Sequence, residues 1–269
     1  LLERVIADRL TFTTKLPQAV QESEIIFITV GTPEGKGGAA NLIAFWEVIE
    51  SLAEITVTTL KIVVIRSTVP PGTNRQAQLF LREHGFPCAI ISNPEFLREG
   101  QALADAHKPD RIVIGARQED AAAIEKMKEL YQPFVRTGRP LFVVRPESAE
   151  LGKLATNFHL ATRISVMSEI ADVATQTDAD IDEIRQVVGW DSRIGSAFLF
   201  AGCGFGGSCF PKDLRALATL GGEENMPIIS AVLKQNRKAK GELFRMFAKH
   251  YNGEIAGKKV TVWGLAFKE

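Results

Sequence analysis

The Gly-rich segment Gly202–Asp213 is the part of the chain best suited to covalent chemistry. Its glycines match the dinucleotide fingerprint GxGxxG in form, but Pro211 would break the helix that this fingerprint requires. Pro211 instead fits the first turn of a new helix, which puts Cys209 at a helix amino end with Lys212 three residues later. Free N–H groups, the helix dipole and the cation all favour a thiolate, so Cys209 is a candidate nucleophile.

A second pair of candidates lies on a long helix that the periodicity predicts from Pro146 to about Gln176. Lys153 and Asn157 are four residues apart and therefore share one helix face, which continues as an apolar stripe. A Lys in that place is suited to proton transfer or to holding a developing oxyanion, with the Asn amide as a second donor. The alternative is a solvated Lys in the first turns of the helix.

Three strand-to-loop junctions offer polar groups at the carboxyl edge of a predicted sheet, where ligands bind in α/β folds. In Asn93–Gly100, Glu95 or Glu99 could act as a general base, and the two would share one face if the segment were helical. The segments Thr29–Pro33 and Arg66–Gly72 present hydroxyls and N–H groups to the phosphates or ribose of a nucleotide. A solvated acidic turn and two ordinary loops are the alternatives.

Short β-branched runs alternate with helical windows between residues 10 and 144, a pattern typical of an α/β fold with a parallel sheet. We expect strands at Leu10–Thr13, Ile25–Val30, Ile62–Arg66, Cys88–Ile91, Arg111–Ile114 and Leu141–Val144. Helices are expected at Leu42–Ile55, Gly72–His84 and Glu119–Tyr131.

Most of the chain after residue 145 is predicted to be helical. After the long helix, further helices are expected at Asp180–Val188, Lys212–Leu220 and Pro227–His250, and a last strand at Lys258–Gly264. The predicted domains are residues 1–145, a nucleotide-binding domain; 146–256, an all-helical central domain that begins with the long helix; and 257–269, the start of a second α/β domain.

Composition excludes several classes of function. The 269 residues carry 32 basic and 32 acidic side chains, so no net field favours nucleic acid or an anionic membrane as a partner. The uncharged stretch 194–211 contains five glycines and is a poor membrane helix. The three cysteines form no CxxC pair and the four histidines are scattered, so we expect no metal site. We also expect reduced thiols and hence a cytoplasmic protein. Cys88 and Cys203 are interpreted as inert core residues.

Six motifs in order resemble the UDP-glucose/GDP-mannose dehydrogenase family over nearly all of the chain: GTP ending at Pro33, STVPPG at Gly72, NPEFLREG at Gly100, ELGKLATN at Asn157, GFGGSCFPKD at Asp213 and GLAFK at Lys268. The resemblance implies a Rossmann-like NAD-binding domain and NAD as the cofactor. It implies a four-electron oxidation of UDP-glucose to UDP-glucuronate through a thiohemiacetal and a thioester on Cys209, within nucleotide-sugar metabolism and polysaccharide biosynthesis.

The resemblance also assigns roles to residues. Lys153 and Asn157 would stabilise oxyanions, Asp213 would support Lys153 and a catalytic water, and Glu95 and Thr68 would activate and order the hydrolytic water. The residues similar to cofactor contacts are Val30, Gly31, Thr32, Pro33, Ser67, Thr68, Glu99, Cys209 and Lys212. Those similar to the sugar-nucleotide site are Glu95, Phe96, Leu97, Arg98, Glu99, Lys153, Asn157, Arg193, Phe200, Gly202, Gly204, Phe205, Gly206, Phe267 and Lys268.

Ser208 and Phe210 match the UDP-glucose branch, because the GDP-mannose branch carries Leu after the Cys and the UDP-N-acetylmannosamine branch carries Gly-Gly-His-Cys. The alternatives are one of those two substrates, a non-catalytic sugar-nucleotide sensor or dimerisation scaffold, and a β-hydroxyacid dehydrogenase, which would lack the Gly-Gly-Ser-Cys loop. The family suggests a homodimer through the long helix.

Two parts of the family pattern fall outside this sequence. The Gly-rich dinucleotide turn and the acidic residue that holds the ribose would lie before Leu1, and most of the uridine-binding domain would lie after Glu269. We therefore expect a chain that lacks both ends, binds NAD weakly or not at all, and does not turn over by itself.

Overall fold

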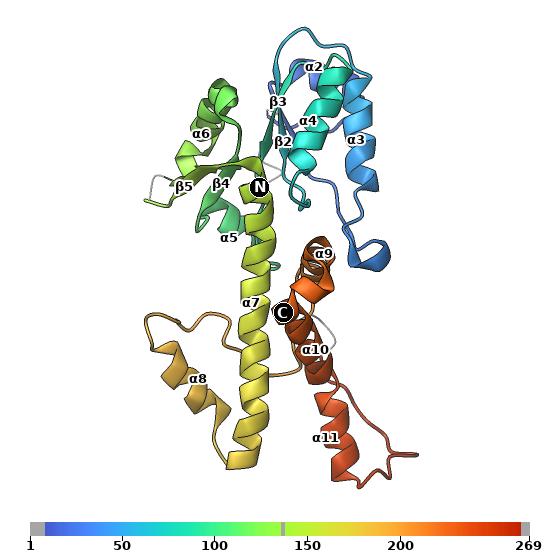
Figure 1. Ribbon diagram of the computed structural model, residues 1–269, viewed down its shortest axis with the longest axis vertical. Helices are drawn as coiled ribbons and strands as arrows, with labels where there is room; N and C mark the ends of the chain where they lie inside the picture. The colour runs from blue at the N-terminus through green and yellow to red at the C-terminus, as the bar shows by residue number, and fades with distance from the viewer. Residues whose placement is uncertain (1–8, 136–137, 265–269) are drawn as a thin grey trace. The chain divides into compact units, whose positions relative to one another are not determined.

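The computed structural model describes residues 9–135 and 138–264, and its elements are shown in Figure 1. The chain forms two compact units. The first comprises Leu1–Thr32, Leu42–Leu97 and Leu103–Glu150, and the second comprises Pro33–Asn41, Arg98–Ala102 and Leu151–Glu269. The first unit holds the sheet and the second is helical, so the fold class expected from the sequence is confirmed.

The sheet of the first unit has five strands in the order β1-β2-β3-β4-β5. They are β1 (Ile25–Ile28), β2 (Lys61–Ile65), β3 (Cys88–Ser92), β4 (Ile112–Gly115) and β5 (Leu141–Val144). The pairs β1/β2, β2/β3 and β4/β5 are parallel, as predicted.

The β3/β4 pair is antiparallel, so the prediction of a wholly parallel sheet is wrong at this point. The two strands meet only at Ser92 and Gly115. The connection between them contains only α5 (Ala102–His107), which the sequence did not predict.

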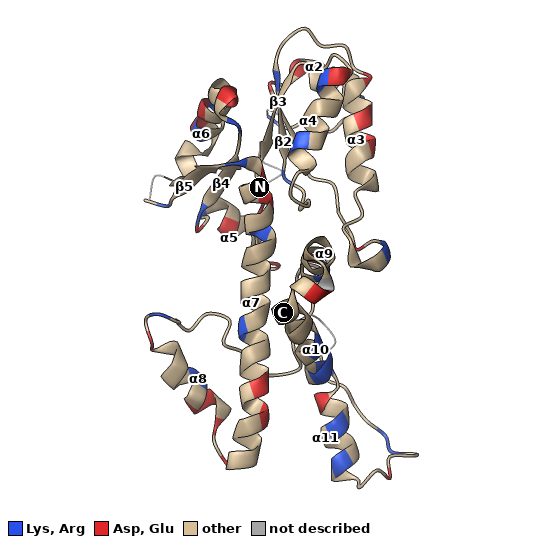
Figure 2. Ribbon diagram, in the orientation of Figure 1, with Lys and Arg blue, Asp and Glu red and all other residues tan. Residues whose placement is uncertain are grey.

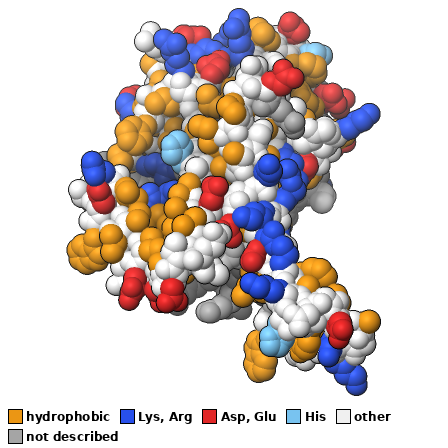
Figure 3. Space-filling view, turned by 60° about the horizontal axis from the view of Figure 1, so that its bottom comes forward, with side chains coloured by type: hydrophobic (Ala, Val, Ile, Leu, Met, Phe, Trp, Pro, Cys, Tyr) orange, Lys and Arg blue, Asp and Glu red, His pale blue; other side chains and the backbone are white. Residues whose placement is uncertain are grey.

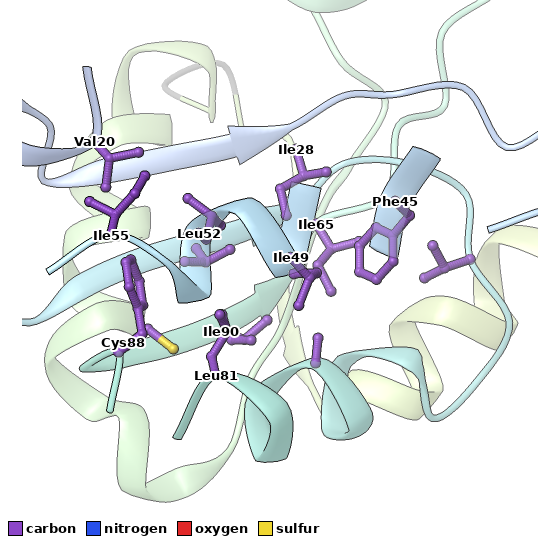
Figure 4. Packing of buried hydrophobic residues seen from close by; sticks show 14 residues of the cluster. Val20, Ile28, Phe45, Ile49, Leu52, Ile55, Ile65, Leu81, Cys88 and Ile90 are labelled. Carbon is purple, nitrogen blue, oxygen red and sulfur yellow. The ribbon is translucent and has the colours of Figure 1, made fainter. Parts of the chain in front are cut away.

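Alternate side chains of the central strands enter two separate apolar clusters. Val63 and Ile65 of β2 join a cluster with helices α3 (Ile43–Ala53) and α4 (Thr73–Glu83), which Figure 4 shows around Ile49, Leu52 and Leu81. Ile62 and Val64 point to the other face, where they pack with α6 (Ala121–Val135). Burial on both faces explains why the strand is a continuous apolar run.

The first predicted strand, Leu10–Thr13, is wrong. The segment is irregular, and Phe12 is largely exposed. The next element is helix α2 (Leu16–Glu22), which has Pro in its first turn and was not expected from the sequence. Its carboxyl end is held by buried Lys61, whose Nζ donates to the carbonyls of Gln21 (3.0 Å) and Ser23 (2.8 Å).

Glu150 fastens the start of helix α7 (Pro146–Thr177) within the first unit. Its buried carboxylate accepts hydrogen bonds from the N–H groups of Gly72 (2.7 Å) and Asn74 (2.9 Å) at the amino end of α4, and from the Ser92 hydroxyl (3.2 Å). Close packing at the same place requires Gly115, because a Cβ there would lie 2.6 Å from that of Ala149.

The second unit is built from α7, α8 (Ile181–Gly189), α9 (Phe210–Gly221), α10 (Pro227–Lys240) and α11 (Glu242–His250), with short 3₁₀ turns at Lys36–Gly38 and Glu223–Asn225. The expected helix Pro227–His250 is divided at Gly241, whose N–H bonds to the carbonyl of Lys238, three residues back. The expected strand Lys258–Gly264 is wrong, since these residues are irregular. In Figure 2 the ribbon of α10 and α11 is blue at their Lys and Arg positions, some of which lie in the last turns of these helices.

Helix α7 supplies the core of the second unit. Ala161 and Ile164 pack with Phe205, Leu214 and Val232 from the Gly-rich loop, α9 and α10. Large hydrophobic side chains also reach the surface in several places, and Figure 3 shows them in patches between charged groups. Within the described residues, no helix combines the length and apolar character needed to cross a membrane.

Candidate active site

Cys209 lies at the amino end of α9, as predicted. It is the N-cap residue, Pro211 occupies the first turn, and the N–H of Asp213 bonds to the Cys209 carbonyl (2.9 Å). The thiol is exposed, and its sulfur lies 3.7 Å from the Ser208 hydroxyl. An exposed thiol at a helix amino end is suited to nucleophilic attack.

The other two cysteines differ from each other. Cys88 is buried in the sheet, where burial raises the pKa of its thiol to about 11, so the interpretation as an inert core residue is confirmed. Cys203 is exposed, so that interpretation is wrong for this position.

Asp213 is the most deeply buried charged group near the thiol, at 1% exposure. Its Oδ2 accepts a hydrogen bond from the side-chain amide of Asn157 (2.6 Å), and its Oδ1 forms an ion pair with Nζ of Lys212 (2.5 Å). Both oxygens therefore have partners, which offsets the cost of burying the charge. The structure thus joins the first turn of α9 to the face of α7 that carries Asn157.

Lys153 and Asn157 are both buried on that face of α7, so the alternative of a solvated Lys is wrong. One helical turn separates them. The Lys153 side chain and the Asn157 amide, which Asp213 orients, are both donors of the kind that can stabilise negative charge developing on a substrate oxygen.

The segment that carries Glu95 is irregular between Asn93 and Arg98, so Glu95 and Glu99 do not share a helix face. One carboxylate oxygen of Glu95 accepts from the N–H of Leu97 (2.5 Å). The segment begins at fully buried Asn93, which donates to the carbonyl of Val113 (2.7 Å).

Asn93 is itself fixed by two side chains that the sequence analysis did not identify. Arg66 donates to its Oδ1 (2.9 Å) and to its carbonyl (3.2 Å), and the hydroxyl of Tyr131 also donates to Oδ1. One feature of the sequence could have pointed to these contacts: Asn93 lies between a predicted strand and Pro94. Where a strand ends, its backbone no longer pairs with a neighbouring strand, so polar side chains have to supply the hydrogen bonds.

The predicted cofactor residues of the first unit are brought together at the ends of β1 and β2. The Thr32 hydroxyl donates to the carbonyl of Thr68 (2.7 Å), and the Ser67 hydroxyl donates to the carbonyl of Val30 (2.6 Å). Between them, the Cβ position of Gly31 has no heavy atom within 4 Å. The two loops are thus tied to each other beside open space.

The remaining predicted residues occupy several places. Pro33, Arg98 and Glu99 belong to the second unit, and Leu97 is exposed. The guanidinium of Arg111 lies 3.7 Å from the ring centroid of Phe96, and that of Arg185 lies 5.4 Å from the ring centroid of Phe200.

In the second unit, exposed Arg193 forms an ion pair with Asp191 (2.7 Å). Gly202, Gly204, Phe205 and Gly206 lie in the loop before Cys209. Phe267 and Lys268 lie outside the described residues.

Curated proteins named UDP-glucose 6-dehydrogenase are similar to the whole chain. The protein from Pseudomonas aeruginosa is 40% identical over 100% of this chain and 60% of its own length, and that from Bacillus subtilis is 40% identical over 99% and 57%. The chain therefore spans about 60% of the length of the curated relatives that it matches.

Solved structures of nucleotide-sugar dehydrogenases are also similar to this chain. A UDP-glucose dehydrogenase from Pyrobaculum islandicum has a TM-score of 0.84 at 35% identity, over 91% of this chain and 57% of that one. A GDP-mannose dehydrogenase from Pseudomonas aeruginosa has a TM-score of 0.63 at 28% identity, over 91% and 58%.

Models of two domains match most of the sequence. The NAD binding domain of the UDP-glucose/GDP-mannose dehydrogenase family matches residues 1–135, and the central domain of the same family matches residues 147–238. Both matches, together with the relatives above, show that this chain belongs to the UDP-glucose/GDP-mannose dehydrogenase family.

Proposed function

We propose that the protein oxidises the primary alcohol of UDP-glucose to the carboxylate of UDP-glucuronate, with NAD as the oxidant and Cys209 as a covalent nucleophile. The observation that carries this proposal is the exposed thiol at the amino end of α9, one turn before a buried Asp213 that binds Asn157 and Lys212. This arrangement provides a nucleophile and oriented donors for acyl chemistry.

The oxidation removes four electrons from one carbon in two steps. Loss of the alcohol proton and of a hydride gives the aldehyde. The thiolate of Cys209 then adds to the aldehyde carbon to form a thiohemiacetal, and loss of a second hydride gives a thioester. Water adds to the thioester carbon and releases the carboxylate together with the Cys209 thiolate.

Lys153 and Asn157 are proposed to hold the oxygen that becomes negative in the thiohemiacetal and again during hydrolysis. Both are buried, so their interactions with an oxyanion are weakly screened by water. Asp213 is proposed to keep the Asn157 amide oriented. Glu95 is proposed as the base for the hydrolytic water, and Thr68 as a residue that orders it.

The loops at the ends of β1 and β2 fit a nicotinamide dinucleotide. The hydroxyls of Thr32 and Ser67 use their protons to tie the loops together, which leaves oxygen lone pairs for the carboxamide and ribose donors of the cofactor. The space at Gly31 permits close approach to the backbone. NAD, when bound, supplies a hydride acceptor.

The reaction is tested with the full-length protein, UDP-glucose and NAD, and we expect two NADH for each sugar oxidised. In Glu95→Gln, the thioester should accumulate and add the mass of the uridine diphosphate glucuronyl group to the peptide that contains Cys209. The exposed Cys203 is the matched control in the same loop. Mass on Cys203, or sugar binding without NADH formation, would contradict the mechanism.

UDP-glucose is proposed as the substrate because Ser208 and Phe210 flank the nucleophile and the closely similar curated proteins carry that name. Competition between UDP-glucose, GDP-mannose and UDP-N-acetylmannosamine at equal concentration tests this choice. A higher kcat/KM with either of the other sugars would overturn it.

We also propose that the protein is a cytoplasmic homodimer. Val166, Ile170 and Val173 are exposed on one face of α7, at a spacing that forms a continuous apolar stripe. Covering such a stripe with the same helix of a second copy gives a two-fold symmetric contact. Light scattering should give twice the monomer mass, and Ile170→Asp should give the monomer.

The proposal of a cytoplasmic location rests on the free thiols, which are typical of a reducing compartment.

A further inference from the structure

The loop before the nucleophile has few backbone partners of its own. It connects α8 to α9 without forming a helix or strand, and it turns at Gly202, Gly204 and Gly207, which all have positive φ angles. A loop of this composition has high conformational freedom, so it requires fixed points if Cys209 is to stay in one place.

Asn236 of α10 provides such a point. Its Oδ1 accepts a hydrogen bond from the N–H of Phe205 (2.7 Å), and its Nδ2 donates to the carbonyl of the same residue (3.1 Å). The side-chain amide therefore binds both backbone groups of one loop residue, as a neighbouring strand would. Asn236 is buried, and a buried amide is costly unless its donors and acceptor have partners.

The contact between Asn236 and Phe205 requires a glycine at position 204. A Cβ at this position would collide with Oδ1 of Asn236 and would lie 3.3 Å from its carbonyl oxygen. The φ angle of +80° also disfavours any residue with a side chain. The absence of a side chain at position 204 thus allows the amide to reach the backbone of Phe205.

The side chain of Phe205 anchors the same loop residue in the apolar core. Its buried ring packs with Ala161 of α7 and Leu214 of α9, and its centroid lies 6.0 Å from that of Phe210, the first residue of α9. The ring is held by apolar packing and the backbone by Asn236. Four residues later the chain reaches Cys209.

We propose that Asn236 is a positioning residue for the nucleophile: by binding both backbone groups of Phe205 it fixes the approach of the loop to Cys209 and the first turn of α9. The proposal rests on the role of Cys209 given above. Its test uses alkylation of the thiol by iodoacetamide, which needs neither NAD nor sugar, so its outcome is independent of turnover.

In Asn236→Ala the backbone of Phe205 loses both of its partners, so Cys209 is held less firmly at the amino end of α9. The expected alkylation rate of Cys209 is about two- to fivefold lower than in the unaltered protein. Gln235→Ala removes the adjacent side chain of α10 and is the matched control, with an unchanged rate. All variants are alkylated at one temperature well below the lowest of their melting temperatures, so that global unfolding does not contribute to the rates.

Gly204→Ala tests the same contact from the loop side and covers the case in which Asn236→Ala does not fold. It should slow alkylation when Asn236 is present and have a smaller effect in Asn236→Ala, because the colliding atom is then absent. An unchanged Cys209 rate in Asn236→Ala, or effects of the two substitutions that simply multiply, would overturn the proposal.

Discussion

The carboxyl of Glu150 is expected to make the stability of the first unit depend on pH. Burial raises its pKa from 4.5 to about 7, and the hydrogen bonds from Asn74, Gly72 and Ser92 only partly oppose that effect. Between these two values the folded protein holds a proton that the unfolded chain has released. The free energy of unfolding therefore falls as the pH rises from 4.5 to 7, and levels off above 7.

The size of the effect follows from the two pKa values. The interval from 4.5 to about 7, at about 1.36 kcal/mol for each pH unit, corresponds to about 3 kcal/mol of stability lost. Glu150→Gln isolates this contribution, because a neutral amide keeps one acceptor and does not titrate. Its free energy of unfolding should lack this loss of about 3 kcal/mol between pH 4 and pH 8.

Tryptophan fluorescence can report on this unit alone. Trp46 packs against the sheet cluster, whereas Trp190 and Trp263 are 88% and 97% exposed and belong to the second unit. Urea unfolding would be followed in proteins that carry Trp190→Phe and Trp263→Phe, so that only Trp46 contributes tryptophan fluorescence. The dependence of the free energy of unfolding on urea concentration should be the same at every pH. Parallel pH profiles for the unaltered protein and Glu150→Gln would refute the reasoning.

Three further substitutions or measurements address other contacts. Gly115→Ala should destabilise the first unit by about 1–3 kcal/mol in urea titrations, because the new Cβ meets that of Ala149; a second change, Ala149→Gly, should recover part of the loss. Lys61→Met should cost about 1–3 kcal/mol in the same titrations, since two carbonyls at the end of α2 lose their donor, and an unchanged midpoint would disprove the role of this Lys. Native Cys88 should be alkylated at pH 8 about a hundredfold more slowly than in urea, because its pKa is about 11; mass spectrometry that found equal rates would contradict its burial.

Local sequence rules predicted much of the site. Pro211 placed Cys209 at a helix amino end because proline is favoured in the first turn of a helix, and the structure has this arrangement. The four-residue spacing of Lys153 and Asn157 placed both on one face of α7, which is buried. These features depend on backbone stereochemistry and on helical periodicity, which act over a few residues.

The same rules failed where a partner distant in the chain decides the outcome. Leu10–Thr13 has the composition of a strand but no covered position in the sheet. The direction of β4 relative to β3 was seen only in their pairing at Ser92 and Gly115. A strand requires hydrogen-bond partners from elsewhere, and composition does not show whether they exist.

The sequence by itself determined the α/β and helical halves, the helix that starts after Cys209, and the family. Only the tertiary structure showed that Asp213 binds Asn157 and Lys212, that Asn93 is held by Arg66, and that Asn236 binds the backbone of Phe205. Each of the contacts with Asn157, Arg66 and Phe205 joins residues 27 to 56 positions apart. A buried polar group must find a partner wherever packing puts one, so these contacts follow from the fold and not from the spacing of residues along the chain.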